Sequence, residues 1–364
     1  MVKAHRIIKI IENIAPEYLE FPGDKNGLHV GSLEMDIRSV LITLEITEGV
    51  VKEAVNYKCN LIVSHHPFIF NPIQNLYFSD IKTEIIKQLL IKKIAVYSAH
   101  SNMDSSPYGI NFMLAQKIGL KYTKPILPVK LSNFKKLVIY IPVTHMDKVR
   151  DKLLSMQLFE TEKYSKMSFS CSGEGTFLPN SKASPFIGVP GHLEKVFEHR
   201  LEVLVEDKNI HNTLENVRKV HPYQEMAFDI YPVENFYHQA GFGLYGEIEE
   251  AISLNKFADQ VKKNLNIKSL RVVGDMNKKI KKIGVISGSG ADYIPYAKNI
   301  GLNVLITGDI KHHDAHNALE KEISIIDAGH YHTEKFFKDI VYNSLKKNKD
   351  INSKISIIKS KIKT

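Results

Sequence analysis

Short runs of β-branched apolar residues alternate with longer helical patterns, and this alternation limits the possible folds more than any other feature. In the first third of the chain the runs are SVLITLEI, CNLIVSHH and KIAVYSAH, with helical patterns over residues 48–57 and 81–91 between them. Such runs are typical of strands buried on both faces of a parallel sheet. The alternation returns near the end of the chain in KKIGVISGS, LNVLITGD and ISIIDAGH. We therefore predict a core of two α/β halves.

The segment between these halves has a different order of predicted strands and helices. KKLVIYIP, a helical pattern over 145–156, SFSCSGEGTFLP, HRLEVLVED, a second helical pattern over 212–220 and MAFDIYPV follow one another as a βαββαβ series. This series predicts an inserted ferredoxin-like domain. We expect the insert to span residues 129–241 and the discontinuous core to consist of residues 1–128 and 242–364, with proline- and glycine-containing joints at both boundaries.

Length and composition are those of a globular protein. The chain has 364 residues, 43% apolar and 24% charged, and its net charge of +9 suits a small anionic substrate. No run reaches the roughly 18 apolar residues of a membrane span, and Cys59 and Cys171 form no disulfide framework, so we expect a cytoplasmic protein without membrane contact. Nucleic acid is not an expected partner, because no basic stripe with interleaved aromatics occurs. The lysine-rich tail, 346–364, is expected to be solvated and partly frayed.

Histidine and carboxylate side chains follow three of the predicted strands. His65 and His66 come after NLIV, His100 and Asp104 after IAVY, and Asp327, His330 and Glu334 after ISII. Ligands of open α/β sheets lie beyond the carboxyl ends of the strands, so we expect these groups to converge. One histidine pair, or one His–Glu pair, is commonly a structural or surface feature. Eight of the sixteen histidines fall in segments after buried strands, however, and this favours a metal site.

The local spacing suits chelation of two ions. Pro67 holds His66 extended, and a turn there lets the neighbouring His65 and His66 serve different metals. If a helix begins just before His330, that residue and Glu334 stand at i and i+4 on one face, with Cβ atoms about 5–6 Å apart. This spacing allows chelation, or a carboxylate that bridges two ions.

The segment GDIKHHDAHNALE carries further candidates. On a helix, Asp309 and His313 would share one face, and His312 and His316 another. We interpret Asp309 and His313 as orienting or proton-transfer groups, and leave the roles of His312, His316 and His332 open. SGSGAD, between a strand and a helix, is either a tight turn or a loop that cradles phosphate. We favour the turn, because the full dinucleotide pattern is missing.

Four motifs together carry a family resemblance. SHHPFIF at 64–70, AHSNMD at 99–104, TGDIKHHDAHNALE at 307–320 and DAGHYHTE at 327–334 resemble, in order, the signature stretches of the Nif-three-like dinuclear-metal family. Many members of that family are labelled GTP cyclohydrolase 1 type 2 homologue. The chain departs from the family pattern at Glu45, where an aspartate is usual, and His312 replaces a frequent tyrosine. No departure removes a ligand.

The resemblance implies a metal site and an assembly. Two divalent ions are held in the family at positions matched here by His65, His66, Asp104, His330 and Glu334. Mixed imidazole and carboxylate ligation suits zinc, iron or manganese. GEGTFLPNSKASPFIG and HPYQEMAFDIYPV resemble the inserted PII-like or CutA-like domain of longer bacterial members. Because such members assemble as ring-shaped hexamers, we expect a homohexamer.

The resemblance also suggests a reaction. Two ions about 3.5–4 Å apart would lower the pKa of a shared water, so we predict a metal-dependent hydrolase. The family label points to ring opening of GTP, with His100 or His313 transferring the proton. Two alternatives stay open. The substrate can be another nucleotide or a phosphate ester, or the protein can be a non-catalytic metal-binding or regulatory assembly protein.

Overall fold

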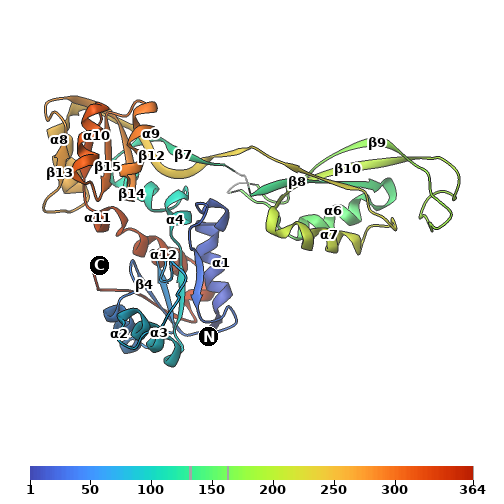
Figure 1. Ribbon diagram of the computed structural model, residues 1–364, viewed down its shortest axis with the longest axis horizontal. Helices are drawn as coiled ribbons and strands as arrows, with labels where there is room; N and C mark the ends of the chain where they lie inside the picture. Colours follow the sequence, from blue (N-terminus) through green and yellow to red (C-terminus); the bar gives the residue numbers. More distant parts are fainter. Residues whose placement is uncertain (131–132, 162–163, 364) are drawn as a thin grey trace. The chain divides into compact units, whose positions relative to one another are not determined.

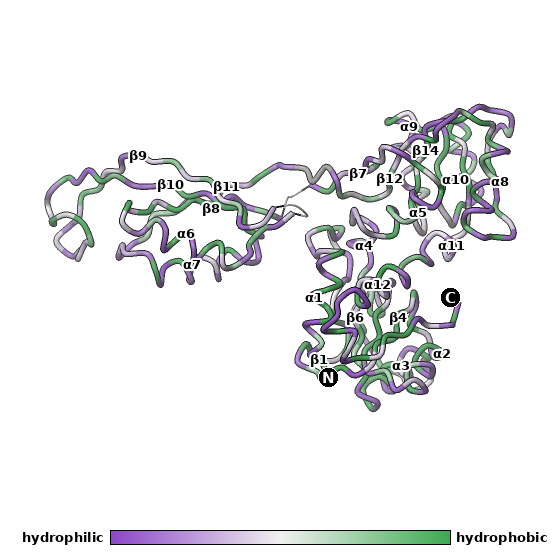
Figure 2. Tube along the Cα trace, turned by 180° about the vertical axis from the view of Figure 1, so that it is seen from behind, coloured by the Kyte–Doolittle hydropathy of each residue, from purple (hydrophilic) through white to green (hydrophobic). Residues whose placement is uncertain are grey.

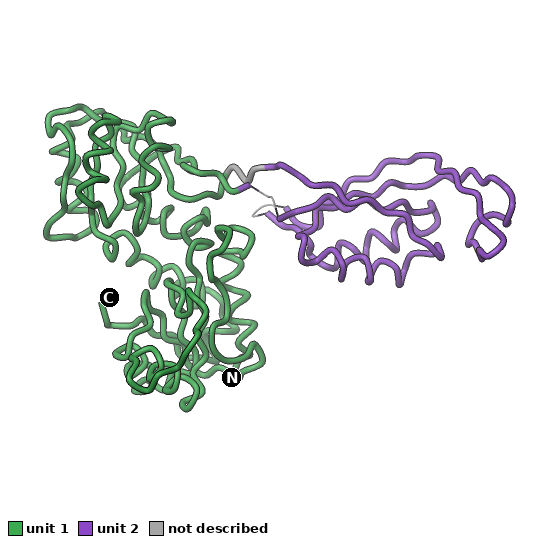
Figure 3. The backbone as a smooth tube through the Cα atoms, viewed as in Figure 1, with its two compact units in different colours: residues 1–129, 237–364 green, residues 130–236 purple. Residues whose placement is uncertain are grey.

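Two compact units make up the chain, and the computed structural model describes residues 1–130, 133–161 and 164–363 of it (Figure 1). Unit 1 consists of Met1–Val129 together with Tyr237–Thr364, and unit 2 of Lys130–Phe236 (Figure 3). Every histidine and carboxylate singled out above lies in unit 1. In the described residues, no helix is long and apolar enough to cross a membrane.

The first sheet of unit 1 has five strands. In spatial order they are β17 (Ser356–Lys359), β4 (Ser39–Thr43), β5 (Leu61–Ser64), β6 (Ala95–Ser98) and β2 (Gly27–Val30). The predicted parallel pairing of β4, β5 and β6 is confirmed, whereas β2 runs antiparallel to β6 at the edge. Two helices pack on one face, α2 (Glu48–Asn56) and α3 (Ile81–Ile91).

The second sheet of unit 1 has six strands. In spatial order they are β13 (Arg271–Val273), β16 (Ser324–Asp327), β15 (Val304–Gly308), β14 (Lys279–Ser289), β12 (Phe236–Ser253) and β7 (Lys121–Lys130). The three strands β14, β15 and β16 are parallel, as predicted, while β12 and β13 pair antiparallel with their neighbours. The helices α9 (Ile294–Asn299) and α10 (His312–Glu320) cover one face.

One hydrophobic cluster joins the two sheets. It contains strand residues of both sheets together with Ile7, Leu114, Phe257 and Phe337, all fully buried. These four come from α1 (Ala4–Ile14), α5 (Ile110–Ile118), α8 (Leu254–Asn264) and α12 (Phe337–Lys347). The apolar face of each helix therefore belongs to one cluster with both sheets, and Figure 2, coloured by hydropathy, lets the pattern be followed along the chain. This shared core holds the two halves of unit 1 together.

The remaining elements of unit 1 are short. They are β1 (Val2–Lys3), β3 (Asp36–Ile37), α4 (Ser101–Ser105), α11 (His330–Glu334), α13 (Lys349–Asn352) and the 3₁₀ turns η1 (Glu17–Leu19) and η4 (Ala291–Tyr293). Two of them, α4 and α11, carry candidate ligands.

The lysine-rich tail is not frayed, so this part of the sequence interpretation was wrong. β17 pairs in parallel with β4, and the Ile357 side chain belongs to the core. Beyond the strand, Ser360 and Lys361 both donate hydrogen bonds to the Glu53 carboxylate. The alternation of apolar residues in KISIIK was masked by the lysines, which stay at the surface while the isoleucines turn inward. Thr364 lies outside the described residues.

Unit 2 has the element order βαββαβ. Its elements are β8 (Phe134–Pro142), η2 (Val143–His145), α6 (Met146–Ser155), β9 (Phe169–Phe177), β10 (Glu194–Glu206), η3 (Asp207–Asn209), α7 (Ile210–Arg218) and β11 (Phe228–Pro232). All three strand pairs are antiparallel, and the spatial order is β11-β8-β10-β9. A core that includes Leu137, Val149, Leu201 and Val217 ties both helices to the sheet.

Candidate metal centre

The candidate ligands lie at the carboxyl ends of strands in both sheets of unit 1. His65 and His66 follow β5 directly, and His100 follows β6. In the second sheet, Gly329 follows β16 with φ of +81° and reverses the chain into α11. The predicted helix from His330 to Glu334 is confirmed. Residues from opposite ends of the sequence meet because the two sheets share one core.

Four histidines use one ring nitrogen in the same way. Each Nδ1 lies within hydrogen-bond distance of an oxygen: His65 of Ala99 O (2.9 Å), His66 of Glu45 Oε1 (2.5 Å), His100 of Asp24 Oδ1 (2.9 Å) and His330 of Asp309 Oδ2 (2.7 Å). Carbonyl and ionised carboxylate oxygens only accept, so each Nδ1 carries the proton. The neutral ring then presents the lone pair of Nε2. Metal-binding histidines are held in this way.

The Nε2 atoms converge on one carboxylate. The Nε2 atom of His65 lies 3.6 Å from Oε1 of Glu334, whereas those of His66 and His330 lie 2.9 and 3.0 Å from Oε2. Asp104 Oδ2 is 3.7 Å from His65 Nε2. His65, His66 and His100 form one group whose potential ligand atoms all lie within 4.8 Å of one another, and His66, His330 and Glu334 form a second. The two groups share His66.

When every ring is neutral and carries its proton on Nδ1, two buried atoms at the centre of this cluster have no hydrogen-bond partner. They are His65 Nε2 and Glu334 Oε2. Buried polar atoms in folded proteins are nearly always paired, and an unpaired one costs about 1–3 kcal/mol. A lone pair of nitrogen and a carboxylate oxygen repel each other unless a cation or a proton lies between them. A divalent cation fits this donor set, because it would satisfy both atoms together.

The neighbouring charges and hydrogen bonds shift the pKa values of three side chains in the cluster. For His66, burial acts to lower the pKa, but hydrogen bonds to Glu334 and Glu45 outweigh it and raise the pKa to about 10. The hydrogen bond to Glu334 raises the pKa of His330 to about 9 against the opposing effect of burial. Burial by itself raises the pKa of Glu334, yet His65 and His330 hold it well below its usual range. The cluster thus favours positive charge beside Glu334.

The SGSG segment supports the cluster from β14. Ser287 donates a hydrogen bond of 2.7 Å to Asp104 Oδ1, and the Gly288 N–H donates one of 2.9 Å to the Thr333 hydroxyl. Gly288 has φ of +63°, and a Cβ at this position would overlap Oε1 of Glu334. Residues 287–289 are the last residues of β14, where the pairing with β15 shifts register, so these residues end an irregular strand and do not form the predicted tight turn. The N–H of Gly288 is already used within the protein and is not free for a phosphate.

Not every predicted site residue joins the cluster. His313 is exposed on α10 and, in the described part of the chain, its one ring contact is with His312. Asp309 precedes α10 with φ of +58°, so the prediction that it shares a helical face with His313 was wrong. Its carboxylate binds His330 instead, which is the orienting contact predicted for Asp309. His316 is exposed and pairs with Glu320 at 3.4 Å.

Sequence reasoning missed two carboxylates that orient histidines. Glu45 was noted only as a departure from a family pattern, yet it holds His66. Asp24 was overlooked in the turn PGDKNG. Burial by itself raises the Asp24 pKa, but hydrogen bonds from His100 and Ser101 outweigh this and hold the pKa well below its usual range. The only signal for Asp24 was an acidic residue in a Pro/Gly turn, which is common in proteins.

Comparisons with known proteins agree with the motifs. The family model described as Duf34/NIF3 (NGG1p interacting factor 3) matches residues 2–364. Proteins named GTP cyclohydrolase 1 type 2 homolog are 37% identical over 345 residues in Bacillus subtilis and 36% over 341 residues in Halalkalibacterium halodurans. Each alignment covers 94% of this chain, and 92% and 91% of the respective relative. A Bacillus cereus protein related to NIF3 has a solved structure with a TM-score of 0.82 and 36% identity, covering 100% of this chain and 98% of that one.

Proposed function

The chain belongs to the Duf34/NIF3 family, and from this premise and its histidine–carboxylate cluster we propose that it is a hydrolase that uses two divalent metal ions. The observation that carries the proposal is the unpaired pair of buried atoms, His65 Nε2 and Glu334 Oε2. The Nδ1 atoms of the surrounding histidines are all hydrogen-bonded to other oxygens. Protonated His66 and His330 can donate to Glu334 Oε2, but no described side chain donates to His65 Nε2, so a cation is the partner that would serve both atoms.

We assign the ligands from the two oxygens of Glu334. Oε1 faces His65, which also approaches Asp104, and Oε2 faces His66 and His330. In this proposal His65 and Asp104 would hold one ion, His66 and His330 would hold a second, and Glu334 would serve both. Nitrogen and oxygen ligands of this mixture suit zinc, iron or manganese.

The chain's own residues supply the rest of the site. When bound, two such ions lower the pKa of a water and polarise a substrate oxygen. His100 is held by Asp24 and directs Nε2 toward the same group as His65 and His66, so it can accept or return a proton there. Asp309 and Glu45 fix the rings of His330 and His66. His313 is no longer proposed for proton transfer, because it is exposed and makes no described contact with the cluster.

The substrate proposed first is GTP, with ring opening as the reaction. It is supported by the name that the Bacillus subtilis and Halalkalibacterium halodurans relatives carry. Other nucleotides and phosphate esters remain the second choice, because the same site would serve them. We also propose that the discontinuous core, 1–128 with 242–364, carries an inserted PII-like or CutA-like domain. The βαββαβ order of unit 2 supports this insert. A homohexamer is proposed on the family resemblance alone.

Metal content and turnover test the proposal together. The protein is loaded with zinc, iron or manganese and offered GTP and a panel of nucleotides and phosphoesters. Glu334→Gln is compared with Glu320→Gln, a matched control whose carboxylate also faces a histidine at i−4 but is exposed. We expect Glu334→Gln to lose bound metal and turnover while Glu320→Gln keeps both. Bound metal without turnover of any substrate would favour the metal-binding assembly protein instead.

A further inference from the structure

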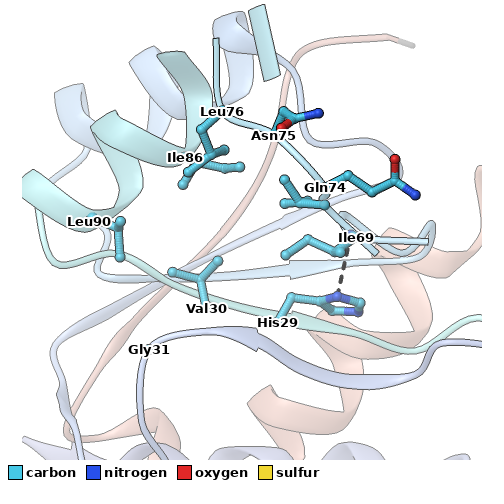
Figure 4. A pocket seen from close by; sticks show the side chains of 10 residues that line it. His29, Val30, Gly31, Ile69, Gln74, Asn75, Leu76, Ile86 and Leu90 are labelled. Atoms are coloured by element: carbon cyan, nitrogen blue, oxygen red, sulfur yellow. Dashed lines mark hydrogen bonds between the residues drawn. The ribbon is translucent and has the colours of Figure 1, made fainter. Parts of the chain in front are cut away.

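A cavity of about 660 Å³ lies in unit 1, and none of the residues that line it belongs to the histidine–carboxylate cluster. Its walls are the edge strand β2, the helix α3 and the loop that joins β5 to α3. Figure 4 shows His29 and Val30 on one side, with Leu76, Ile86 and Leu90 opposite them. The other residues that line it are Gly31, Ile69, Ile73, Gln74 and Asn75. Its volume is within the range of about 300–1,000 Å³ usual for small-molecule sites.

The cavity lining carries no charge. Gln74 and Asn75 are neutral amides, and the remaining lining residues are apolar except for His29. His29 is fixed as a neutral ring: the Ile69 N–H donates to Nδ1 at 3.3 Å, so the proton is on Nε2, which lies 3.0 Å from the Lys25 carbonyl oxygen. Burial also lowers the pKa of His29. A molecule that fits this lining has an uncharged, partly apolar body.

A cation, Lys82, lies on α3 one helical turn before the cavity residue Ile86, although it does not itself line the cavity. Lys82 precedes Ile86 and Leu90 by one and two helical turns, so it shares the face of α3 that lines the cavity. Its ammonium group donates to the Phe68 carbonyl oxygen and lies 3.9 Å from the centre of the Phe68 ring.

Phe68 links the cavity to the metal centre along the chain. It lies between Ile69 of the cavity wall and His66 of the metal centre. Because these two residues are three positions apart, their Cα atoms are at most about 11 Å apart. Lys82 and Glu45, the carboxylate that holds His66, also interact electrostatically. An anion at Lys82 therefore lies toward the metal centre.

We propose that this cavity and Lys82 form a subsite for a phosphorylated organic molecule of about nucleoside size, with its uncharged body in the cavity and its phosphate at Lys82. The inference rests on the proposed hydrolase function, because Lys82 interacts electrostatically with Glu45, the carboxylate that holds His66. It adds a place where the organic part of such a phosphate would bind. Inorganic phosphate would use Lys82 without the cavity.

Calorimetric binding to the metal-loaded protein tests both parts, with GMP and inorganic phosphate as probes. We expect GMP to bind about tenfold more tightly than phosphate. The double variant Leu76→Trp/Leu90→Trp narrows the cavity with two rings, so it weakens GMP about tenfold and leaves phosphate unchanged. Lys82→Met weakens both probes about tenfold, since a charge-assisted hydrogen bond is lost.

Matched variants separate these effects from general damage. Tyr77→Trp/Ile91→Trp adds rings at exposed neighbours that do not line the cavity, and Lys87→Met removes an exposed lysine of the same helix. Both are expected to bind GMP as the unchanged protein does. Leu76 and Leu90 are themselves 57% and 61% exposed, so their replacement is compatible with folding.

Either of two results would overturn the subsite. One is GMP binding that the Leu76→Trp/Leu90→Trp variant leaves unchanged, and the other is GMP binding no tighter than that of phosphate. Turnover is not measured in this experiment. The subsite can therefore fail while the Glu334→Gln comparison still supports hydrolysis, and the reverse outcome is equally distinguishable.

Discussion

The two ends of the histidine–carboxylate cluster are built differently. At the buried end, the side chains of His65 and Asp104 are 0% and 7% exposed, and they are held by the Ala99 carbonyl and the Ser287 hydroxyl. At the open end, those of His330 and Asp309 are 37% and 52% exposed and hold each other. The buried end is fixed by the fold itself, whereas the open end depends on a side chain free to move in solvent. Substitutions at the two ends should therefore differ in size.

The largest effect is expected at the buried end. His65→Ala removes a proposed ligand nitrogen and leaves the Asp104 and Glu334 carboxylates facing each other, so metal affinity should fall more than about 100-fold, beyond the usual effect of losing an orienting partner. Chelator competition measures this loss. His313→Ala, an exposed histidine of α10, serves as the control and should leave affinity unchanged. Equal losses in both variants would contradict the ligand assignment.

The two carboxylates that orient histidines, Asp24 and Asp309, should differ in their contribution to the free energy of unfolding. Asp24 is 6% exposed in its side chain and accepts hydrogen bonds from His100 and Ser101, whereas Asp309 accepts one and is exposed. Asp24→Asn should lower the free energy of unfolding of the metal-free protein by about 1.5–3 kcal/mol. Asp309→Asn should cost less than about 1 kcal/mol. Urea unfolding measures both, and a larger cost for Asp309 would reverse the proposed contrast.

The pH dependence of metal binding probes His66 and His330, whose pKa values are raised to about 10 and 9 in the metal-free protein. Both carry protons at neutral pH, and a metal must displace them. Metal affinity should therefore fall about tenfold per proton displaced for each unit by which the pH is lowered. Proton release measured by calorimetry checks that metal binding displaces these protons, and binding without proton release would contradict the expected loss of affinity.

The contribution of these two groups to the stability of the metal-free protein has the opposite pH dependence. It is fully present below their ordinary pKa of 6.5 and is lost as pH rises through 9 to 10.

Among the substitutions that change metal affinity, the smallest effect is expected at Gly288. Both Gly288→Ala and Gly301→Ala place a Cβ on left-handed backbone, at φ of +63° and +70°, which costs about 1–2 kcal/mol. Only the Cβ at 288 meets Glu334, and no atom lies within 4 Å of the one at 301. The Glu334 carboxylate can swing aside, so stability should fall equally in both variants. Metal affinity should fall, by about tenfold, in Gly288→Ala alone. Equal affinity in the two variants would show that Glu334 tolerates displacement.

The sequence by itself determined the alternation of buried strands and helices, the i, i+4 placement of His330 and Glu334, and the strand ends at which ligands appear. These features follow from local periodicity, which depends only on neighbouring residues. The lysine-rich tail was misjudged, because whether Ile357 is buried depends on its pairing with β4, more than 300 residues away.

Only the tertiary structure decided which polar groups serve the cluster. Asp24 and Glu45 reach His100 and His66 across the fold, and His313 stays outside although its spacing looked suitable. Side-chain type and spacing fix what a residue can bind, whereas its partner depends on where the two sheets bring distant segments together. The meeting of His65 with Glu334 follows from the core shared by those sheets, because the free energy of burying their apolar faces holds the two strand ends face to face.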